Sequence, residues 1–286
     1  MSSIATGRAT GDGKARYVWR VVGYFILLAI INTITFEIEG VASSFAPSWA
    51  GVLLEGLFYL AATLALTWAF CRFLDRSSLS QLGLQKRRWL AYLGAGLGLG
   101  ALLIILVFAV LWAAGWLTVD RSVTWQSPEF VASVLTWIII SFVEELSFRG
   151  YIMQGLARAW GMPAAVAVSS VLFGAVHALN PNPSVLGVFT IVVIGVLFAC
   201  AYLLTRSLWL PVGLHIGWNL VEIQFLGFPG SGHTEPSILH TITRGPVVMT
   251  GGAFGPEGGI VALAAALLGI VMLLISHRVA AGRKIR

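Results

Sequence analysis

The chain has 286 residues, of which 58% are hydrophobic and only 10% are charged, and its mean hydropathy is +0.88. This balance excludes an ordinary soluble globular domain and predicts an all-α, polytopic transmembrane helical bundle. The formal net charge of +6 does not indicate nucleic-acid binding. The Lys and Arg residues lie between apolar runs, where they set membrane topology.

The first 124 residues predict a polar tail and a scaffold of three membrane spans. Residues 1–16 are rich in Gly, Ser and Arg, and we expect a disordered cytoplasmic tail there. The apolar run 17–36 has a basic flank, as a signal peptide does. Because Glu37 and Glu39 close it without a convincing cleavage site, we favour a retained signal anchor over a cleaved peptide. Runs 49–70 and 89–116 complete the scaffold, residues 17–124.

The third predicted span opens with four glycines at alternate positions. Glycines four residues apart on a helix let a neighbouring helix approach closely, and no strand precedes them, so a phosphate-binding loop is not indicated. We therefore expect a helix-packing surface. These glycines are Gly94, Gly96, Gly98 and Gly100.

Residues 125–227 predict four further spans, which we expect to form the functional core. A helix is expected over 128–160, because Pro128 suits a first turn and Gly161 and Pro163 end the pattern. The following spans are expected to end near residue 179, to cover 184–204 and to cover 208–225. An outer loop over 228–258 and a final span with a basic cytoplasmic tail over 259–286 complete a count of eight spans.

The basic residues support this count. With both termini in the cytoplasm, 16 of the 18 Lys and Arg residues fall on the cytoplasmic side, as the positive-inside rule requires. The outer loop is rich in Gly and Pro, so a re-entrant element within it stays an alternative. It also contains His233 and His240, for which solvated side chains are a better interpretation than a metal site.

The segment 141–150 places charged residues within one of the most apolar regions. A charge inside hydrocarbon costs about 2.5–3.5 kcal/mol on insertion scales, so such residues indicate a functional site. Glu145 and Arg149 are four apart, in the favourable order for an ion pair on one helical face. Glu144 points away from that face and is left available for chemistry.

Two later segments carry polar side chains that could meet Glu144. If the chain reverses at Gly161, His177 lies at the same depth as Glu144, about 24 Å above the turn at 1.5 Å per residue. His215 and Asn219 are four apart and share one helical face. The alternatives are a hydrogen-bonded core histidine and polar contacts that only hold helices together.

Glu144–Glu145 with Arg149, then Phe173 with His177, then His215 with Asn219, resembles the motif set of the CPBP family. That family comprises the type II CAAX prenyl endopeptidases and the bacteriocin-processing and immunity proteins, also called Abi. The resemblance covers roughly residues 125–227, and all three motifs occur in order. It implies intramembrane peptide hydrolysis: Glu144 and His177 act on water, and His215 and Asn219 stabilise the oxyanion. Glu145, Arg149 and Phe173 support them.

The chemistry expected from these residues needs no cofactor. A carboxylate in a low-dielectric cavity gains proton affinity, which suits a general base. A zinc-dependent version remains an alternative, with Glu144, His177 and His215 as ligands and water in the open position. No serine or cysteine nucleophile with a partner base is evident, and Cys71 and Cys200 are expected to be buried thiols.

The expected partners are the lipid bilayer and a membrane-anchored or lipidated protein substrate, cut near the cytoplasmic face, and the composition fits a bacterial inner membrane. The sequence carries no signal for an oligomeric state.

Two other functions stay open. A non-catalytic immunity or partner-binding protein would use the same fold without hydrolysis. A proton-coupled transporter would use the buried Glu and His as a relay, but it predicts inverted repeats, which we do not find.

Overall fold

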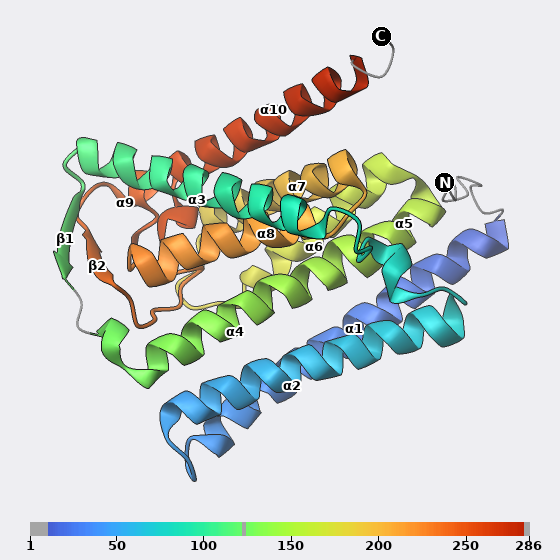
Figure 1. Ribbon diagram of the computed structural model, residues 1–286, viewed down its shortest axis with the longest axis horizontal. Helices are drawn as coiled ribbons and strands as arrows, with labels where there is room; N and C mark the ends of the chain where they lie inside the picture. The colour runs from blue at the N-terminus through green and yellow to red at the C-terminus, as the bar shows by residue number, and fades with distance from the viewer. Residues whose placement is uncertain (1–10, 122–123, 283–286) are drawn as a thin grey trace.

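The computed structural model describes residues 11–121 and 124–282, which form a bundle of helices with one two-stranded sheet (Figure 1). This architecture confirms an all-α polytopic bundle. The helices are α1 (Gly11–Ala42), α2 (Ser48–Ala69), α3 (Trp89–Ala113), α4 (Pro128–Glu145), α5 (Met153–Trp160), α6 (Met162–His177), α7 (Val185–Thr205), α8 (Trp209–Asn219), α9 (Val247–Thr250) and α10 (Ile260–Gly282). Strands β1 (Leu117–Arg121) and β2 (Leu239–Thr243) pair antiparallel, with Val119 opposite Thr241.

Residues 128–160 form one continuous rod, as the sequence predicted. Its start is capped by Ser127, whose hydroxyl accepts the backbone N–H of Phe130 at 3.3 Å. Its end coincides with Gly161, which has φ +84°. Within the rod, the π-helical segment η4 (Leu146–Ile152) joins α4 to α5.

Another π-helical segment, η5 (Leu220–Phe225), continues α8. Segments of this kind often occur at functional sites. Here η4 begins directly after Glu145, and η5 begins directly after Asn219. Both therefore lie beside residues that the sequence singled out.

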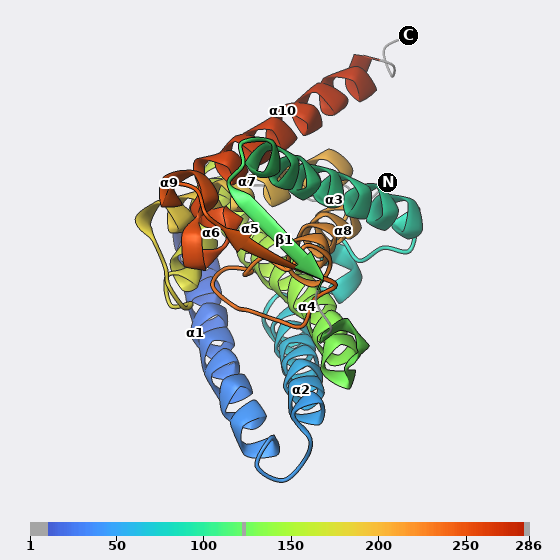
Figure 2. The ribbon, with the colours of Figure 1, turned by 90° about the vertical axis from the view of Figure 1, so that its left-hand side faces the viewer.

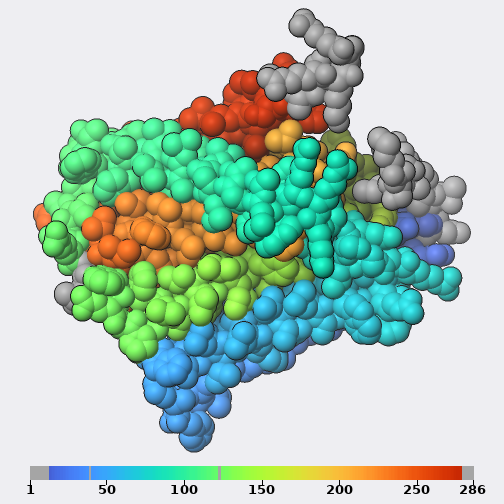
Figure 3. Space-filling model, viewed as in Figure 1, coloured from blue at the N-terminus to red at the C-terminus, as the bar shows by residue number. Residues whose placement is uncertain are grey.

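The helices form a closed ring in two layers. The layer α2, α4, α8 and α3 makes one continuous face, in which each helix contacts the next (Figure 3). Behind it lie α1, α5, α6 and α7, and α10 runs along the upper edge in Figure 1. Each of these helices also contacts the next one around the ring. Helix α1 closes the ring on α2, and α10 closes it on α3.

Six helices of the described residues are long and apolar enough to cross a membrane, which makes the protein an integral membrane protein. They are α1, α2 with its π-helical extension, α3, the 128–160 rod, α7 and α10. The other two predicted spans are helices as well, but α6 has only 16 residues and α8 only 11 before η5. The count of eight spans therefore stays a prediction.

Two segments expected to be irregular contain regular structure. Helix α1 already begins at Gly11, so residues 11–16 are helical and not part of a disordered tail; residues 1–10 lie outside the described part. The segment 228–258, which the sequence predicted as an outer loop, has helices and a strand of its own. It contains β2, α9 and the short helical turns η6 (Gly252–Phe254) and η7 (Pro256–Gly258), and it folds over one end of the bundle (Figure 2).

Candidate active site

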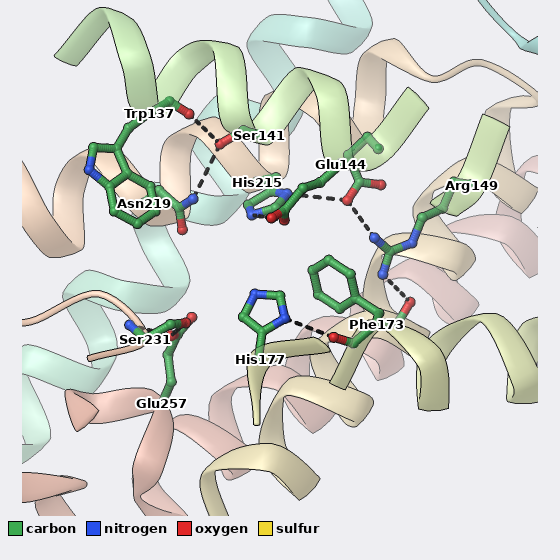
Figure 4. Close-up of polar contacts among 12 residues, drawn as sticks. Trp137, Ser141, Glu144, Arg149, Phe173, His177, His215, Asn219, Ser231 and Glu257 are labelled. Atoms are coloured by element: carbon green, nitrogen blue, oxygen red, sulfur yellow. Dashed lines mark hydrogen bonds and ion pairs between the residues drawn. The ribbon is translucent and has the colours of Figure 1, made fainter. Parts of the chain in front are cut away.

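A cavity of about 680 Å³ lies inside the ring of helices. Its walls come from α1, α2, α4, α6, α7 and α8 and from the segment 228–258. All four residues predicted to carry catalysis line it, namely Glu144, His177, His215 and Asn219. Figure 4 shows their side chains directed into the same space from α4, α6 and α8.

The predicted ion pair between Glu145 and Arg149 is present and fully buried. An Arg149 Nη1 hydrogen is donated to Glu145 Oε1 at 2.6 Å, and Nη2 donates to the carbonyl of Gly195 on α7 at 3.0 Å. The guanidinium also lies over two aromatic rings, 4.3 Å from the centroid of Phe173 and 5.0 Å from that of Phe198. Arg149 thus joins the η4 segment to α7 and α6, and it fixes the Glu145 carboxylate.

His215 is held between the two adjacent glutamates. Its Nδ1 lies 3.2 Å from Glu145 Oε1, and its Nε2 lies 3.8 Å from Glu144 Oε2. The ring stacks on Phe198 with a centroid separation of 4.6 Å. A carboxylate only accepts hydrogen bonds, so Nδ1 of His215 carries the proton. The Nε2 contact, at 3.8 Å, is longer than a hydrogen bond, so Nε2 of His215 remains available to another partner.

His177 is oriented by its own helix. Its Nδ1 lies 2.7 Å from the backbone carbonyl oxygen of Phe173, one turn earlier. Because a carbonyl oxygen accepts only, Nδ1 is the donor, and the neutral ring presents the lone pair of Nε2. Phe173 also packs against the ring, with a centroid distance of 4.7 Å.

Asn219 is the fourth wall residue and is positioned by α4. Its Nδ2 donates to the hydroxyl of Ser141 at 3.2 Å, and that hydroxyl donates to the backbone carbonyl of Trp137 at 2.8 Å. This chain of hydrogen bonds (Figure 4) fixes the amide and leaves its second N–H and its oxygen for other partners.

The segment 228–258 adds a carboxylate that the sequence analysis missed. Glu257, in η7, lines the cavity beside His177 and is only 4% exposed. Its Oε2 accepts hydrogen bonds from both the backbone N–H and the hydroxyl of Ser231. Burial raises the pKa of Glu257, although the two Ser231 hydrogen bonds and the nearby His177 and His215 oppose that shift.

Glu257 gave only a weak signal in the sequence, because it lies far from the three motifs. The cue available was a single acidic residue between glycines, in Gly255–Pro256–Glu257–Gly258, directly before an apolar span. Nothing in the sequence alone shows that this turn folds back to the cavity.

The side chains that line the cavity are not arranged as a metal cluster. Among the described residues, no group of three or more His, Cys, Asp or Glu side chains has a geometry that could hold a metal ion. His233 lines the cavity, whereas His240 is exposed on β2. Cys71 is buried and Cys200 half-buried, both as free thiols.

The fold and the cavity define a polytopic membrane protein with an intramembrane site built from glutamates, histidines and an asparagine. Residues 124–221 match the family model described as Type II CAAX prenyl endopeptidase Rce1-like. This stretch is therefore an Rce1-like domain, which confirms the resemblance seen in the three motifs, and it supports a CAAX-protease-like intramembrane endopeptidase in general. A search of curated proteins finds no match.

Proposed function

We propose that the protein hydrolyses a peptide bond of a membrane-anchored protein with a water molecule activated by Glu144. The observation that carries this proposal is the convergence of Glu144, His177, His215 and Asn219 on one cavity from three different helices. Helices placed only to bury apolar surface have no reason to gather four hydrogen-bonding side chains at one place in hydrocarbon.

The two hydrogens of the attacking water need two acceptors. The Glu144 carboxylate and the Nε2 lone pair of His177 supply them, which leaves an oxygen lone pair of the water directed at the substrate carbonyl carbon. As the C–O bond forms, Glu144 takes one proton from the water. This proton is returned, with His177 as relay, to the amide nitrogen when the C–N bond breaks.

The substrate oxygen becomes an anion in this step. In this proposal, an Nε2–H of His215 and the amide N–H of Asn219 donate to it. Removing one donor of this kind usually lowers the rate about 10²–10³-fold. Glu145 and Arg149 do not touch the substrate in this scheme; they hold His215 in the donating orientation.

The experiment that tests the proposal is Glu144→Gln, which preserves shape and removes the base. New protein N-termini in membranes are compared between cells with the wild type and cells with the variant. Termini that depend on the protein should be lost, with a rate reduction of about 10²–10⁴-fold for each product. Glu129→Gln is the matched control on the same helix, because Glu129 lies at its exposed start and contacts Ser48. A variant that keeps all products would favour the non-catalytic binding protein.

We also propose that no metal takes part, and chelation tests this. The purified protein should keep its cleavage activity after treatment with a strong chelator, and its metal content should stay well below one ion per chain. If chelation abolishes cleavage and Zn²⁺ restores it, then Glu144, His177 and His215 are zinc ligands instead.

A further inference from the structure

The basic residues lie mostly at one end of the bundle. Of the 14 Lys and Arg residues in the described part, 11 lie at the end where α1 begins and α10 ends: Lys14, Arg16, Arg20, Arg72, Arg76, Lys86, Arg87, Arg88, Arg158, Arg206 and Arg278. Two lie at the opposite end, where β1 and β2 pair: Arg121 and Arg244. The remaining one, Arg149, is buried beside the cavity. Since Lys and Arg favour the cytoplasmic side, the strand end faces away from the cytoplasm.

The cavity is open toward the strand end. Its exposed lining residues are Ala29, Thr33 and Phe36 in the later half of α1, Leu179 and Pro181 after α6, and Thr234 just before β2. The later half of α1 points to the strand end, because its first turns lie at the basic end (Figure 1). The α1–α2 hairpin also projects away from the other helices there (Figure 2).

The other end of the cavity is sealed. Between Glu144 and the basic end, Tyr24 stacks on Tyr151 with a centroid distance of 4.3 Å, and Phe70 meets both rings edge-on. These three aromatic residues are buried, and none of them lines the cavity.

Polar contacts lock this aromatic cluster in place. The Tyr24 hydroxyl lies 2.8 Å from Thr67 Oγ1 and donates to Ser147 Oγ at 3.2 Å. One turn further toward the basic end, Arg20 forms an ion pair with Asp75 at 2.6 Å. Opening a passage here would require breaking buried hydrogen bonds and an aromatic stack together.

We infer that the cavity opens on the non-cytoplasmic side of the membrane, and that the substrate is the non-cytoplasmic juxtamembrane segment of a membrane-anchored protein. Such a segment enters past the later half of α1 and reaches Glu144 from the strand end. From the sequence alone we expected a peptide near the cytoplasmic face, but the position of the opening favours the opposite side. The substrate part of this inference rests on the proposed function; the side of the opening does not.

Thiol labelling tests the side of the opening without an activity assay. In a Cys71→Ala, Cys200→Ala background, a single cysteine is placed at Thr234 on the rim, at Ser133 within the cavity, or at Ser80 between α2 and α3. Right-side-out and inverted membrane vesicles are then treated with a membrane-impermeant thiol reagent. We expect Thr234→Cys and Ser133→Cys to react only in right-side-out vesicles, and Ser80→Cys to react only in inverted ones.

Every other pattern overturns the inference. The reverse pattern, or equal labelling of Thr234→Cys from both sides, contradicts the orientation. Labelling of Ser133→Cys from the cytoplasmic side contradicts the aromatic seal. If Ser133→Cys reacts in neither vesicle but does react after denaturation, the cavity is closed to water from both sides.

The termini lost in Glu144→Gln test the substrate. We expect their cleavage positions to lie in non-cytoplasmic segments within a few residues of a membrane span. Positions in cytoplasmic tails would overturn the inference while leaving proteolysis intact. If no terminus depends on Glu144, the proposed proteolysis and the proposed substrate class are both wrong. The labelling experiment still decides the side of the opening.

Discussion

His177 and His215 differ because of the partner that each Nδ1 contacts. His177 donates to the backbone carbonyl of Phe173 and so presents a lone pair, whereas His215 donates to Glu145 with Glu144 beside its other nitrogen. One ring is thereby suited to accept from water and the other to donate to an oxyanion. Partners of this kind decide the chemistry of an imidazole as much as its position does.

Glu257 offers a test of whether a charged group at the cavity wall affects the pH dependence of cleavage. Its carboxyl group interacts electrostatically with His177 on α6, with His215 on α8 and with the buried Glu222 on η5. Because burial raises its pKa, its charge appears at higher pH than for an ordinary carboxyl group. We expect Glu257→Gln to lower the cleavage rate and to remove one step from the pH–rate profile.

Ser231→Ala is the companion variant. The Ser231 hydroxyl stabilises the charged carboxylate, so its loss should raise the pKa of Glu257 further and move the same step to higher pH. The measurement is the pH–rate profile of the three proteins, with thermal unfolding as the control for folding. Three profiles of identical shape would show that Glu257 is only structural.

At the residue scale, the sequence predicted the members of the three motifs but not their neighbours. Glu144, Glu145 and Arg149 stood out because charge is rare in an apolar helix. Ser141 did not stand out, since a serine in a membrane helix usually bonds its own backbone. Glu257 depends on how a Gly- and Pro-rich segment folds, and no periodic pattern describes such a segment.

Among the elements, α3 and α8 pack most closely, and glycines on both helices allow it. A Cβ atom at Gly96 would lie 2.2 Å from the Leu210 carbonyl oxygen, and one at Gly100 would lie 2.1 Å from that of Leu214. The contact is reciprocal. A Cβ atom at Gly213 or Gly217 would lie 2.1 or 2.3 Å from a carbonyl oxygen of α3. Since α8 carries His215 and Asn219, this contact sets the position of one cavity wall.

Gly100→Ala should therefore displace α8. The added methyl group meets backbone, which cannot rotate away, so we expect a loss of at least about 1–3 kcal/mol in the free energy of unfolding. Cleavage should fall as well. Gly98→Ala is the matched control on the same helix, because nothing lies within 4 Å of its Cβ position. Thermal unfolding in detergent measures the stability of both variants. Equal unfolding midpoints would contradict the role of the close contact.

At the element scale, the sequence predicted a glycine-mediated contact on α3 but could not say which glycines take part. Gly96 and Gly100 make it, whereas Gly94 and Gly98 face open space. The choice depends on how α3 is rotated against its neighbour, and local sequence does not fix rotation. The partner glycines of α8 went unnoticed, because Gly213 and Gly217 lie among the more conspicuous His215 and Asn219.

At the scale of the whole molecule, composition and charge predicted more of the architecture than the motifs did. The hydropathy pattern gave the helices, and the distribution of Lys and Arg separates two ends of the bundle. The direction in which the cavity opens was not predictable, because it depends on distant segments. Tyr24, Phe70 and Tyr151 come together from α1, the π-helical extension of α2 and η4 to seal one end, and the turn 255–258 folds back at the other.

The cavity opening past α1 gives the last prediction. Thr33 lines the cavity and is exposed, and its hydroxyl bonds only the carbonyl of Ala29 on its own helix, so a tryptophan fits there without disturbing a buried contact. We expect Thr33→Trp to obstruct the substrate and to reduce cleavage at low substrate concentration by about tenfold, equivalent to about 1.4 kcal/mol.

Ile34→Trp is the matched control for this obstruction. Ile34 is the next residue on α1; it is 44% exposed and does not line the cavity. Both variants add a large aromatic side chain to the same turn, so any effect on insertion or stability should be shared. Cleavage is compared at equal protein levels in right-side-out vesicles, with thermal unfolding as a second readout. An equal loss of cleavage in both variants would mean that α1 does not border the substrate path, and access would then have to run between other helices of the ring.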